Sequence, residues 1–216
     1  SIGVTRLSLG IENFDDEVLQ ENGRAHLSGE IYRAWEWIEE ADFPAVNVDL
    51  IAGMVGETND NWDRCIEKTL GLSPDSVTVY QMELPFNTVY SREMLDGDGK
   101  TRVATWSQKR DWVRQAFARF QEAGYHVSSG YTLVRDPERC KFVYRDALWR
   151  GADMVGVGVA SFSHVSSVHY QNLDRFEDYV ETLAQGRLPL SRARRVSDGE
   201  RLIRELVLQM KLGRLD

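Results

Sequence analysis

Apolar and polar residues alternate along the first 123 residues in a pattern that occurs three times. Each occurrence has a short β-branched run, a polar turn and a longer segment of helical periodicity. The runs cover residues 5–11, 45–51 and 76–82, and the helical segments cover 15–19, 28–40, 59–70 and 106–123. Strands that alternate with such helices are typical of parallel β/α units, and three units are too few to close a complete barrel. The pattern therefore predicts an α/β fold built on a partial parallel barrel.

The pattern changes after Gly124. Residues 125–133 and 153–159 indicate strands, and helices are expected at 173–185 and 197–212. We therefore expect a boundary near Gly124, with a partial barrel over residues 1–124 and a C-terminal α+β subdomain over residues 125–216.

Composition narrows the class of protein. Hydrophobic residues make up 42% of the chain and charged residues 28%, which is typical of a globular protein. The net charge of −8 argues against general binding of nucleic acid or anionic lipid. No apolar run approaches the roughly 20 residues of a membrane span. We expect neither a nucleic-acid partner nor a membrane partner.

The two cysteines and the first residues bear on location and completeness. Cys65 and Cys140 lie far apart in a chain without a secretion signal, so a reducing, cytoplasmic compartment is expected. Cys65 falls on the apolar face of its helix and is expected to be a core residue. The chain opens directly into a strand, so we expect it to begin partway through a fold.

Candidate chemistry lies where the predicted strands end, because β/α folds bind ligands at the carboxyl ends of their strands. The polar and aromatic residues there are Glu12, Asn13, Asp49, Tyr80, Gln81 and Glu83. Asp49 lies between Val48 and Leu50, where a carboxylate is costly unless it has a partner. Two partners remain open for Asp49, a bound ligand and an internal salt bridge.

Other motifs carry less information. Arg24 is by composition alone a surface arginine, and His164 and His169 lack a third ligand, so no metal site is expected. Gly156 and Gly158 lack the third glycine of a dinucleotide-binding loop. They fit either close approach of the backbone to a flat ligand or another strand, or a buried strand that makes room for aromatic residues.

Six blocks of sequence, taken in order, resemble the radical SAM enzymes of the oxygen-independent coproporphyrinogen III oxidase family. The blocks are GVTRLSLGIENF at 3–14, GR at 23–24, NVDLIAGMVGET at 47–58, VYQMELPFNT at 79–88, LWRGAD at 148–153 and GVG at 156–158. The resemblance covers nearly all 216 residues.

The resemblance implies a partial (β/α) barrel that binds a [4Fe-4S] cluster and S-adenosylmethionine (SAM). Such an enzyme cleaves SAM reductively to act on a tetrapyrrole or similar aromatic substrate, with an electron donor such as flavodoxin or ferredoxin. The family's cluster ligands form a Cys-x-x-x-Cys-x-x-Cys motif that this chain lacks. The resemblance therefore implies the second half of a barrel whose N-terminal half is missing, and a chain that is inactive alone.

The resemblance also assigns five cofactor-binding residues and leaves the catalytic residues unknown. Glu12 stands where the family has a glutamine that contacts SAM, and Arg24 matches an arginine that reaches the cofactor's polar groups. Asp49 matches an aspartate of the cofactor pocket, Tyr80 falls beside the adenosyl group, and Glu83 lies in the adjacent lining.

Several functions within this resemblance stay open. Haem chaperones of the family carry a His-Asn-x-x-Tyr motif before the Trp-Arg-Gly block, and this chain has Tyr144, Arg145 and Asp146 there, so haem loading through that motif is not expected. Other relatives are radical C-methyltransferases or open the haem ring anaerobically. A non-catalytic β/α module that binds a cofactor or tetrapyrrole is the alternative outside enzyme chemistry.

Overall fold

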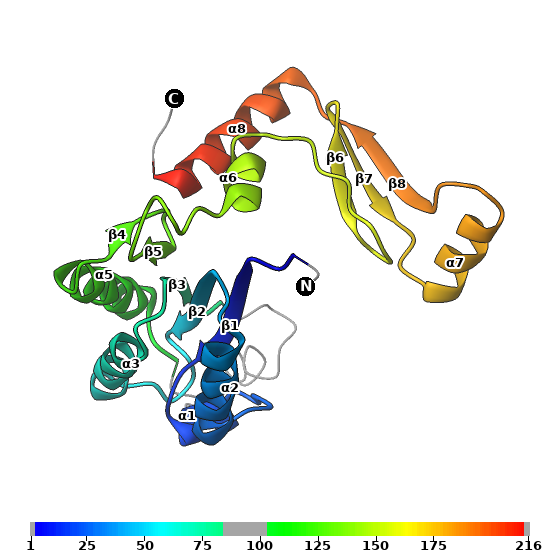
Figure 1. The fold of residues 1–216 in the computed structure, drawn as a ribbon. Coiled ribbons are helices and arrows are strands. Elements are labelled where there is room, and N and C mark those ends of the chain that lie inside the picture. Colours follow the sequence, from blue (N-terminus) through cyan, green and yellow to red (C-terminus); the bar gives the residue numbers. More distant parts are fainter. Residues whose placement is uncertain (1–2, 84–102, 214–216) are drawn as a thin grey trace. The chain divides into compact units, whose positions relative to one another are not determined.

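The computed structural model describes residues 3–83 and 103–213, and the chain divides into two compact units, Ser1–Lys141 and Phe142–Asp216. Figure 1 shows the elements of both units. The described elements of the first unit are β1 (Arg6–Glu12), α1 (Asp16–Glu21), α2 (Ser28–Ala41), β2 (Ala45–Ala52), α3 (Asn59–Leu72), β3 (Ser76–Gln81), α5 (Trp106–Glu122), β4 (His126–Val127) and β5 (Thr132–Val134).

The first unit is built on a sheet in the order β1-β2-β3-β5-β4. Strands β1, β2 and β3 are parallel neighbours, which confirms the parallel β/α prediction for this part of the chain. Strand β5 runs antiparallel to both β3 and β4. The carboxyl ends of β1, β2 and β3 therefore meet at one edge of the sheet.

The two faces of this sheet differ in polarity because side chains alternate along a strand. In β2, Val48 and Leu50 are fully buried and belong to the apolar core, which also contains side chains of α2, α3 and α5. The intervening Asn47 and Asp49 are bonded to polar side chains of the neighbouring strands. The sheet thus has an apolar, helix-covered face and a polar face.

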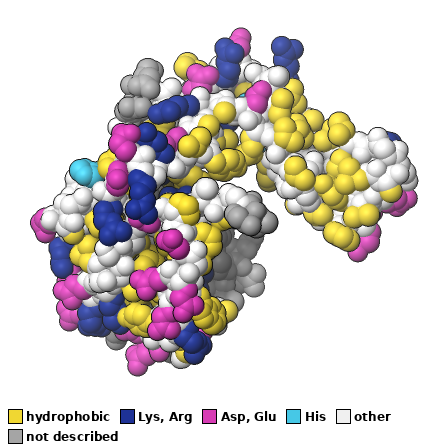
Figure 2. Space-filling view, viewed as in Figure 1, with side chains coloured by type: hydrophobic (Ala, Val, Ile, Leu, Met, Phe, Trp, Pro, Cys, Tyr) yellow, Lys and Arg dark blue, Asp and Glu magenta, His cyan; other side chains and the backbone are white. Residues whose placement is uncertain are grey.

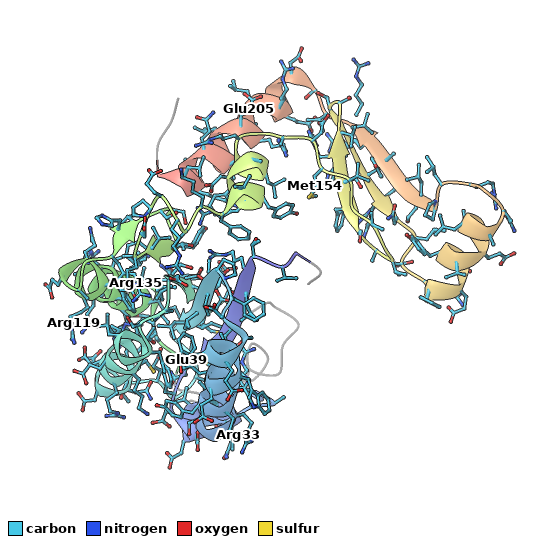
Figure 3. The ribbon with its side chains drawn as sticks, in the orientation of Figure 1. Arg33, Glu39, Arg119, Arg135, Met154 and Glu205 are labelled. Atoms are coloured by element: carbon cyan, nitrogen blue, oxygen red, sulfur yellow. The ribbon has the colours of Figure 1, made fainter. Side chains whose placement is uncertain are left out.

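Helices α3 and α5 pack against each other over the apolar face. Trp62 of α3 is fully buried, and its Nε1 donates to the Trp112 carbonyl 2.9 Å away on α5. Arg119, labelled in Figure 3, lies 3.7 Å from an Asp63 oxygen and 3.6 Å from a Glu67 oxygen of α3. A buried tryptophan contributes several kcal/mol to stability, whereas such partly exposed ion pairs contribute about 1 kcal/mol or less.

Residues 125–133 differ from the expected single strand. They contain two short antiparallel strands, and the Tyr131 carbonyl accepts a hydrogen bond from the Val79 amide of β3 at 2.8 Å. Pairing in this way covers the otherwise open edge of β3. The division between compact units therefore falls after Lys141 in this structure, and the domain boundary near Gly124 stays a prediction.

The second unit contains an antiparallel sheet in the order β6-β7-β8. Its elements are α6 (Val143–Trp149), β6 (Phe162–Val165), β7 (Val168–Asn172), α7 (Phe176–Ala184), β8 (Leu190–Arg195) and α8 (Asp198–Leu212). The two helices expected after residue 172 are present, and Ser197 caps α8 by accepting from the Glu200 amide.

The strand expected over residues 153–159 is wrong. Only Met154, labelled in Figure 3, forms an isolated bridge, with His164. A Cβ on Gly156 would lie 2.2 Å from the Phe162 carbonyl oxygen, and Gly158 has a φ of +106°. Of the two interpretations of these glycines, the structure supports the first for Gly156, because the backbone there lies close to the backbone of β6.

Two further expectations concern chain segments. The block VYQMELPFNT at 79–88 lies, from residue 84 onward, outside the described residues. Within residues 3–83 and 103–213, no helix is both long enough and apolar enough to cross a membrane.

Candidate functional site

Glu12 ends β1 in an unusual backbone conformation. Its φ is +67°, and the register between β1 and β2 shifts between Gly10 and Glu12. The Asn13 amide donates to the Ile11 carbonyl at 2.8 Å, which closes a three-residue turn centred on Glu12. The turn brings the Glu12 carboxylate 2.6 Å from Nε of Arg24, in the loop between α1 and α2.

The contact between Glu12 and Arg24 leaves hydrogen-bonding capacity unused. Glu12 Oε2 and Arg24 Nε are buried, and neither has a hydrogen-bond partner within the described part of the chain. At 2.6 Å the two atoms are close enough, so the N–H direction must miss the oxygen, and the contact is one of charge. Buried polar atoms of this kind are costly unless a further partner satisfies them.

Few described atoms lie beside this pair at Gly10. A Cβ built on Gly10 would meet only Oε1 of Glu12, at 4.0 Å, among the described atoms. Gly10 is opposite Asp49 in the register of β1 and β2, so this position belongs to the polar face. Among the described atoms, the glycine therefore leaves the side of the Glu12 carboxylate that faces residue 10 uncovered.

Asp49 belongs to a hydrogen-bonded group within the sheet. Its carboxylate accepts from Ser8 Oγ at 2.8 Å and from Asn47 Nδ2 at 2.8 Å. The Asn47 oxygen in turn accepts from Ser76 and Thr78 of β3. Neutral donors of its own sheet thus bind Asp49, and the described residues give it no salt bridge, so the internal ion pair left open by the sequence is not formed.

Tyr80 lies in β3, and Glu83 follows the end of that strand. The Tyr80 side chain is 45% exposed, and its ring centroid lies 6.2 Å from that of Tyr131. Glu83 is exposed. Burial lowers the pKa of Lys109 of α5, and the negative charge of Glu83 opposes part of this shift. Lys109 Nζ donates to the Met82 carbonyl at 2.7 Å, which ties α5 to the end of β3.

The five expected site residues form one close pair and three separate positions. Asp49 is opposite Thr78, and Tyr80 follows Thr78 by two residues, so both side chains project from the polar face. The Glu12 carboxylate lies on this face too, beside the Gly10 position. No interaction between the described residues joins the Glu12 and Arg24 pair to Tyr80 or Glu83, and cofactor contact by all five stays a prediction.

A buried polar cluster behind Glu12 was missed as a unit by sequence reasoning. It consists of Asn13, Glu57, Asn61 and Cys65. Burial raises the pKa of Glu57 to about 8 and that of Cys65 to about 12. The hydrogen bonds that both groups accept lower their pKa values, but by less than burial raises them. Asn13 stands at a strand end and could be noticed, whereas its partners lie 44 or more residues away and carry no local signal.

The cysteines of this chain do not fit an iron–sulfur cluster. Cys65 is 1% exposed and Cys140 is 4% exposed, and burial raises the pKa of both thiols, whereas cluster ligands are thiolates. The side chains of His164 and His169 are cross-strand neighbours. In the described ranges, no three His, Cys, Asp or Glu residues form a group that could hold a metal ion.

Comparison with known proteins gives no matching protein-family profile but several similar proteins. The oxygen-independent coproporphyrinogen III oxidase of Pseudomonas aeruginosa is 24% identical, over 97% of this chain and 47% of that protein. The heme chaperone HemW of Bacillus subtilis is 21% identical, over 97% of this chain and 54% of that protein.

A solved structure agrees with these sequence similarities. Coproporphyrinogen III oxidase (HemN) from Escherichia coli, described as a radical SAM enzyme, has a TM-score of 0.75 and 21% identity over 97% of this chain and 50% of that one. The chain spans about half the length of the curated relatives it matches. Together, the similar sequences and this shared fold agree with the resemblance to the oxygen-independent coproporphyrinogen III oxidase-like radical SAM proteins over about half of their length.

Proposed function

We propose that this chain is part of a radical SAM enzyme, and that Glu12 and Arg24 bind SAM in the intact protein. The observation that carries this proposal is the half-buried ion pair of Glu12 and Arg24, in which two buried atoms have no hydrogen-bond partner among the described residues, beside Gly10. It lies at the carboxyl edge of parallel strands, where β/α folds bind ligands.

The chemistry of SAM is complementary to this pair. SAM carries an anionic carboxylate, which a guanidinium such as Arg24 binds well. It also carries cationic groups, which the charge of a carboxylate such as Glu12 attracts, and hydroxyl groups, from which that carboxylate can accept hydrogen bonds. Asp49, Tyr80 and Glu83 are proposed to line the same face. Ser8 and Asn47 already orient the Asp49 carboxylate, so it would place a negative charge beside SAM without a change in its side-chain conformation.

The proposed reaction is the reductive cleavage of SAM for attack on a tetrapyrrole or similar aromatic substrate. In support, the names of the relatives refer to coproporphyrinogen and heme. The partly exposed Tyr80 and its neighbour Tyr131 offer an aromatic surface that a flat ring system could contact. When bound, SAM and a reduced [4Fe-4S] cluster together supply radical chemistry at a carbon atom.

The proposal requires partners for this chain. Because its two cysteines do not fit a cluster, the cluster ligands are proposed to belong to the other half of the barrel in the intact protein. An electron donor such as flavodoxin or ferredoxin would reduce the cluster, and the compartment is proposed to be the cytoplasm. The residues of this chain hold and orient SAM and form one wall of the substrate space.

The test uses the intact protein with its cluster reconstituted anaerobically. We expect reductant-dependent formation of 5′-deoxyadenosine from SAM. Arg24→Ala should weaken SAM binding about tenfold or more, because a hydrogen bond to a charged group contributes about 1.5–3 kcal/mol. Arg33→Ala is the matched control, since Arg33 is an exposed arginine of α2 (Figure 3). A fully reconstituted protein that never forms 5′-deoxyadenosine would contradict the proposal.

A second candidate is a non-catalytic module that binds a cofactor or tetrapyrrole without a cluster. The buried, protonated thiols of this chain favour it, because neither could serve as a cluster ligand. Iron and sulfide analysis of the intact protein separates the two candidates. Four irons per chain favour the enzyme, whereas binding of SAM or a porphyrin without iron favours the module.

A further inference from the structure

The turn at Glu12 is strained and needs a cause. A positive φ is unfavourable for a residue with a Cβ, and a γ-turn with a positive central φ is rare. Glu12 nevertheless has a φ of +67° within such a turn. Strained conformations of this kind persist only where surrounding contacts fix them, and they concentrate at functional sites.

The next residue supplies those contacts. Asn13 is fully buried, and its Nδ2 donates to Glu57 Oε1 at 2.7 Å and to Asn61 Oδ1 at 3.0 Å. Its Oδ1 accepts from the Asp15 amide at 2.9 Å and from the Cys65 thiol at 3.1 Å. A side-chain amide has two donor hydrogens and two acceptor positions, so all the capacity of Asn13 is used.

The partners of Asn13 are themselves fixed in place. Asn61 and Cys65 lie one turn apart on α3 and are almost fully buried. Glu57 belongs to the loop before α3, and its second oxygen accepts from the Gly53 amide at 2.5 Å. Asn13 is therefore held by the loop after β2 and by α3, and displacing it would leave several buried polar groups without partners.

We propose that Asn13 is a positioning residue that holds Glu12 at its positive φ and so directs the Glu12 carboxylate toward Arg24 and the Gly10 position. Release of Asn13 would let residue 12 return to a negative φ and move the carboxylate. The binding of SAM by the Glu12 carboxylate rests on the proposed function. The effect of Asn13 on the conformation of the turn does not depend on that function.

The first experiment is a double-mutant cycle on this chain. Glu12→Ala and Glu12→Gly both remove the carboxylate, but only glycine relieves the strain of a positive φ. We expect the unfolding equilibrium constant of Glu12→Ala to exceed that of Glu12→Gly about fivefold with Asn13 present, and the two to be nearly equal in the Asn13→Ala background. The same ratio in both backgrounds would overturn the proposal.

The second experiment reads the backbone directly. NMR coupling constants and chemical shifts of residue 12 should report a positive φ in the natural chain and a negative φ after Asn13→Ala. If Asn13→Ala does not fold, Asn13→Ser replaces it, because the shorter side chain cannot reach Glu57, Asn61 and Cys65 together. A folded variant that retains the positive φ of Glu12 would refute the role of Asn13.

The third experiment separates this inference from the proposed function. Calorimetric titration of the intact protein with SAM should show weaker binding by about tenfold for Asn13→Ala and for Glu12→Ala, although Asn13→Ala keeps the carboxylate. If the natural protein does not bind SAM, the proposed function fails, and the cycle and the NMR measurement still decide the role of Asn13. SAM binding that is unchanged by Asn13→Ala would overturn the link to the ligand.

Discussion

Glu57 gives a prediction about stability and pH. Burial raises its pKa from 4.5 to about 8, so between these values the folded protein holds a proton that the unfolded chain has released. Protonation thus favours the folded state: the contribution is complete below the unfolded pKa of 4.5 and is lost as the pH rises through 8. Glu57→Gln, which is neutral at every pH, removes this dependence.

The magnitude follows from the size of the shift. One pKa unit corresponds to about 1.4 kcal/mol, so the natural protein should lose roughly 2.5 kcal/mol of unfolding free energy relative to Glu57→Gln between about pH 5.5 and about pH 7.5. Cys65, beside Glu57, does not contribute in this range, because burial raises its pKa to about 12.

The assay is urea denaturation at several pH values, followed by tryptophan fluorescence, to which the buried Trp62 contributes. Taking the difference between the two proteins cancels the titration of the histidines. Glu36→Gln, which removes an exposed carboxylate from α2, controls for the loss of one negative charge. A difference between the natural protein and Glu57→Gln that stays constant across the pH range would show that the pKa of Glu57 is not raised by folding.

Four further substitutions, one of them a control, test the packing. Trp62→Ala should cost about 3–5 kcal/mol of unfolding free energy in urea denaturation, because a fully buried ring is lost together with its bond to the Trp112 carbonyl. Gly53→Ala should cost about 1–3 kcal/mol, since its Cβ would lie 2.6 Å from Lys109 Cγ at a φ of +92°, and loss of the Lys109 contact with Met82 should be visible by NMR. Gly156→Ala should lower the melting temperature through a 2.2 Å contact with the Phe162 carbonyl, whereas Gly199→Ala, with no atom within 4 Å, should leave it equal or higher. Equal effects of the two glycine substitutions would contradict the packing described for residue 156.

The sequence predicted the first three β/α units because each strand and helix shows its own period over several turns or residues. In β2, Val48 and Leu50 alternate with Asn47 and Asp49, and this alternation became the two faces of the sheet. The same pattern could not identify the partners of Asp49. Ser8 lies 41 residues away, and only the parallel register brings it within 2.8 Å.

The strands of the second unit were harder to predict. Residues 162–172 are rich in serine and histidine and lack a clear apolar alternation, so β6 and β7 give little signal. The valines at 155 and 157 suggested a strand, yet both are exposed, 65% and 85%. Gly156 allows the backbone of this segment to lie close to Phe162, and such a contact leaves no trace in the spacing of apolar residues.

Helical periodicity also predicted elements without predicting what covers them. Leu202, Leu206 and Met210 recur along α8 as expected for an amphipathic helix, and all three are exposed in the described structure. Figure 2 shows hydrophobic side chains gathered on the viewed face of the second unit over β6, β7, β8 and α7. A pattern indicates which face is apolar, and only tertiary structure supplies its partner.

The most direct test of the proposed site is a crystal structure of the intact protein with SAM bound. SAM is expected to lie on the polar face of the sheet, with its carboxylate or another polar group within hydrogen-bond distance of Arg24 and with Glu12 retaining its positive φ. SAM bound elsewhere, with Glu12 and Arg24 in contact only with each other, would contradict this expectation.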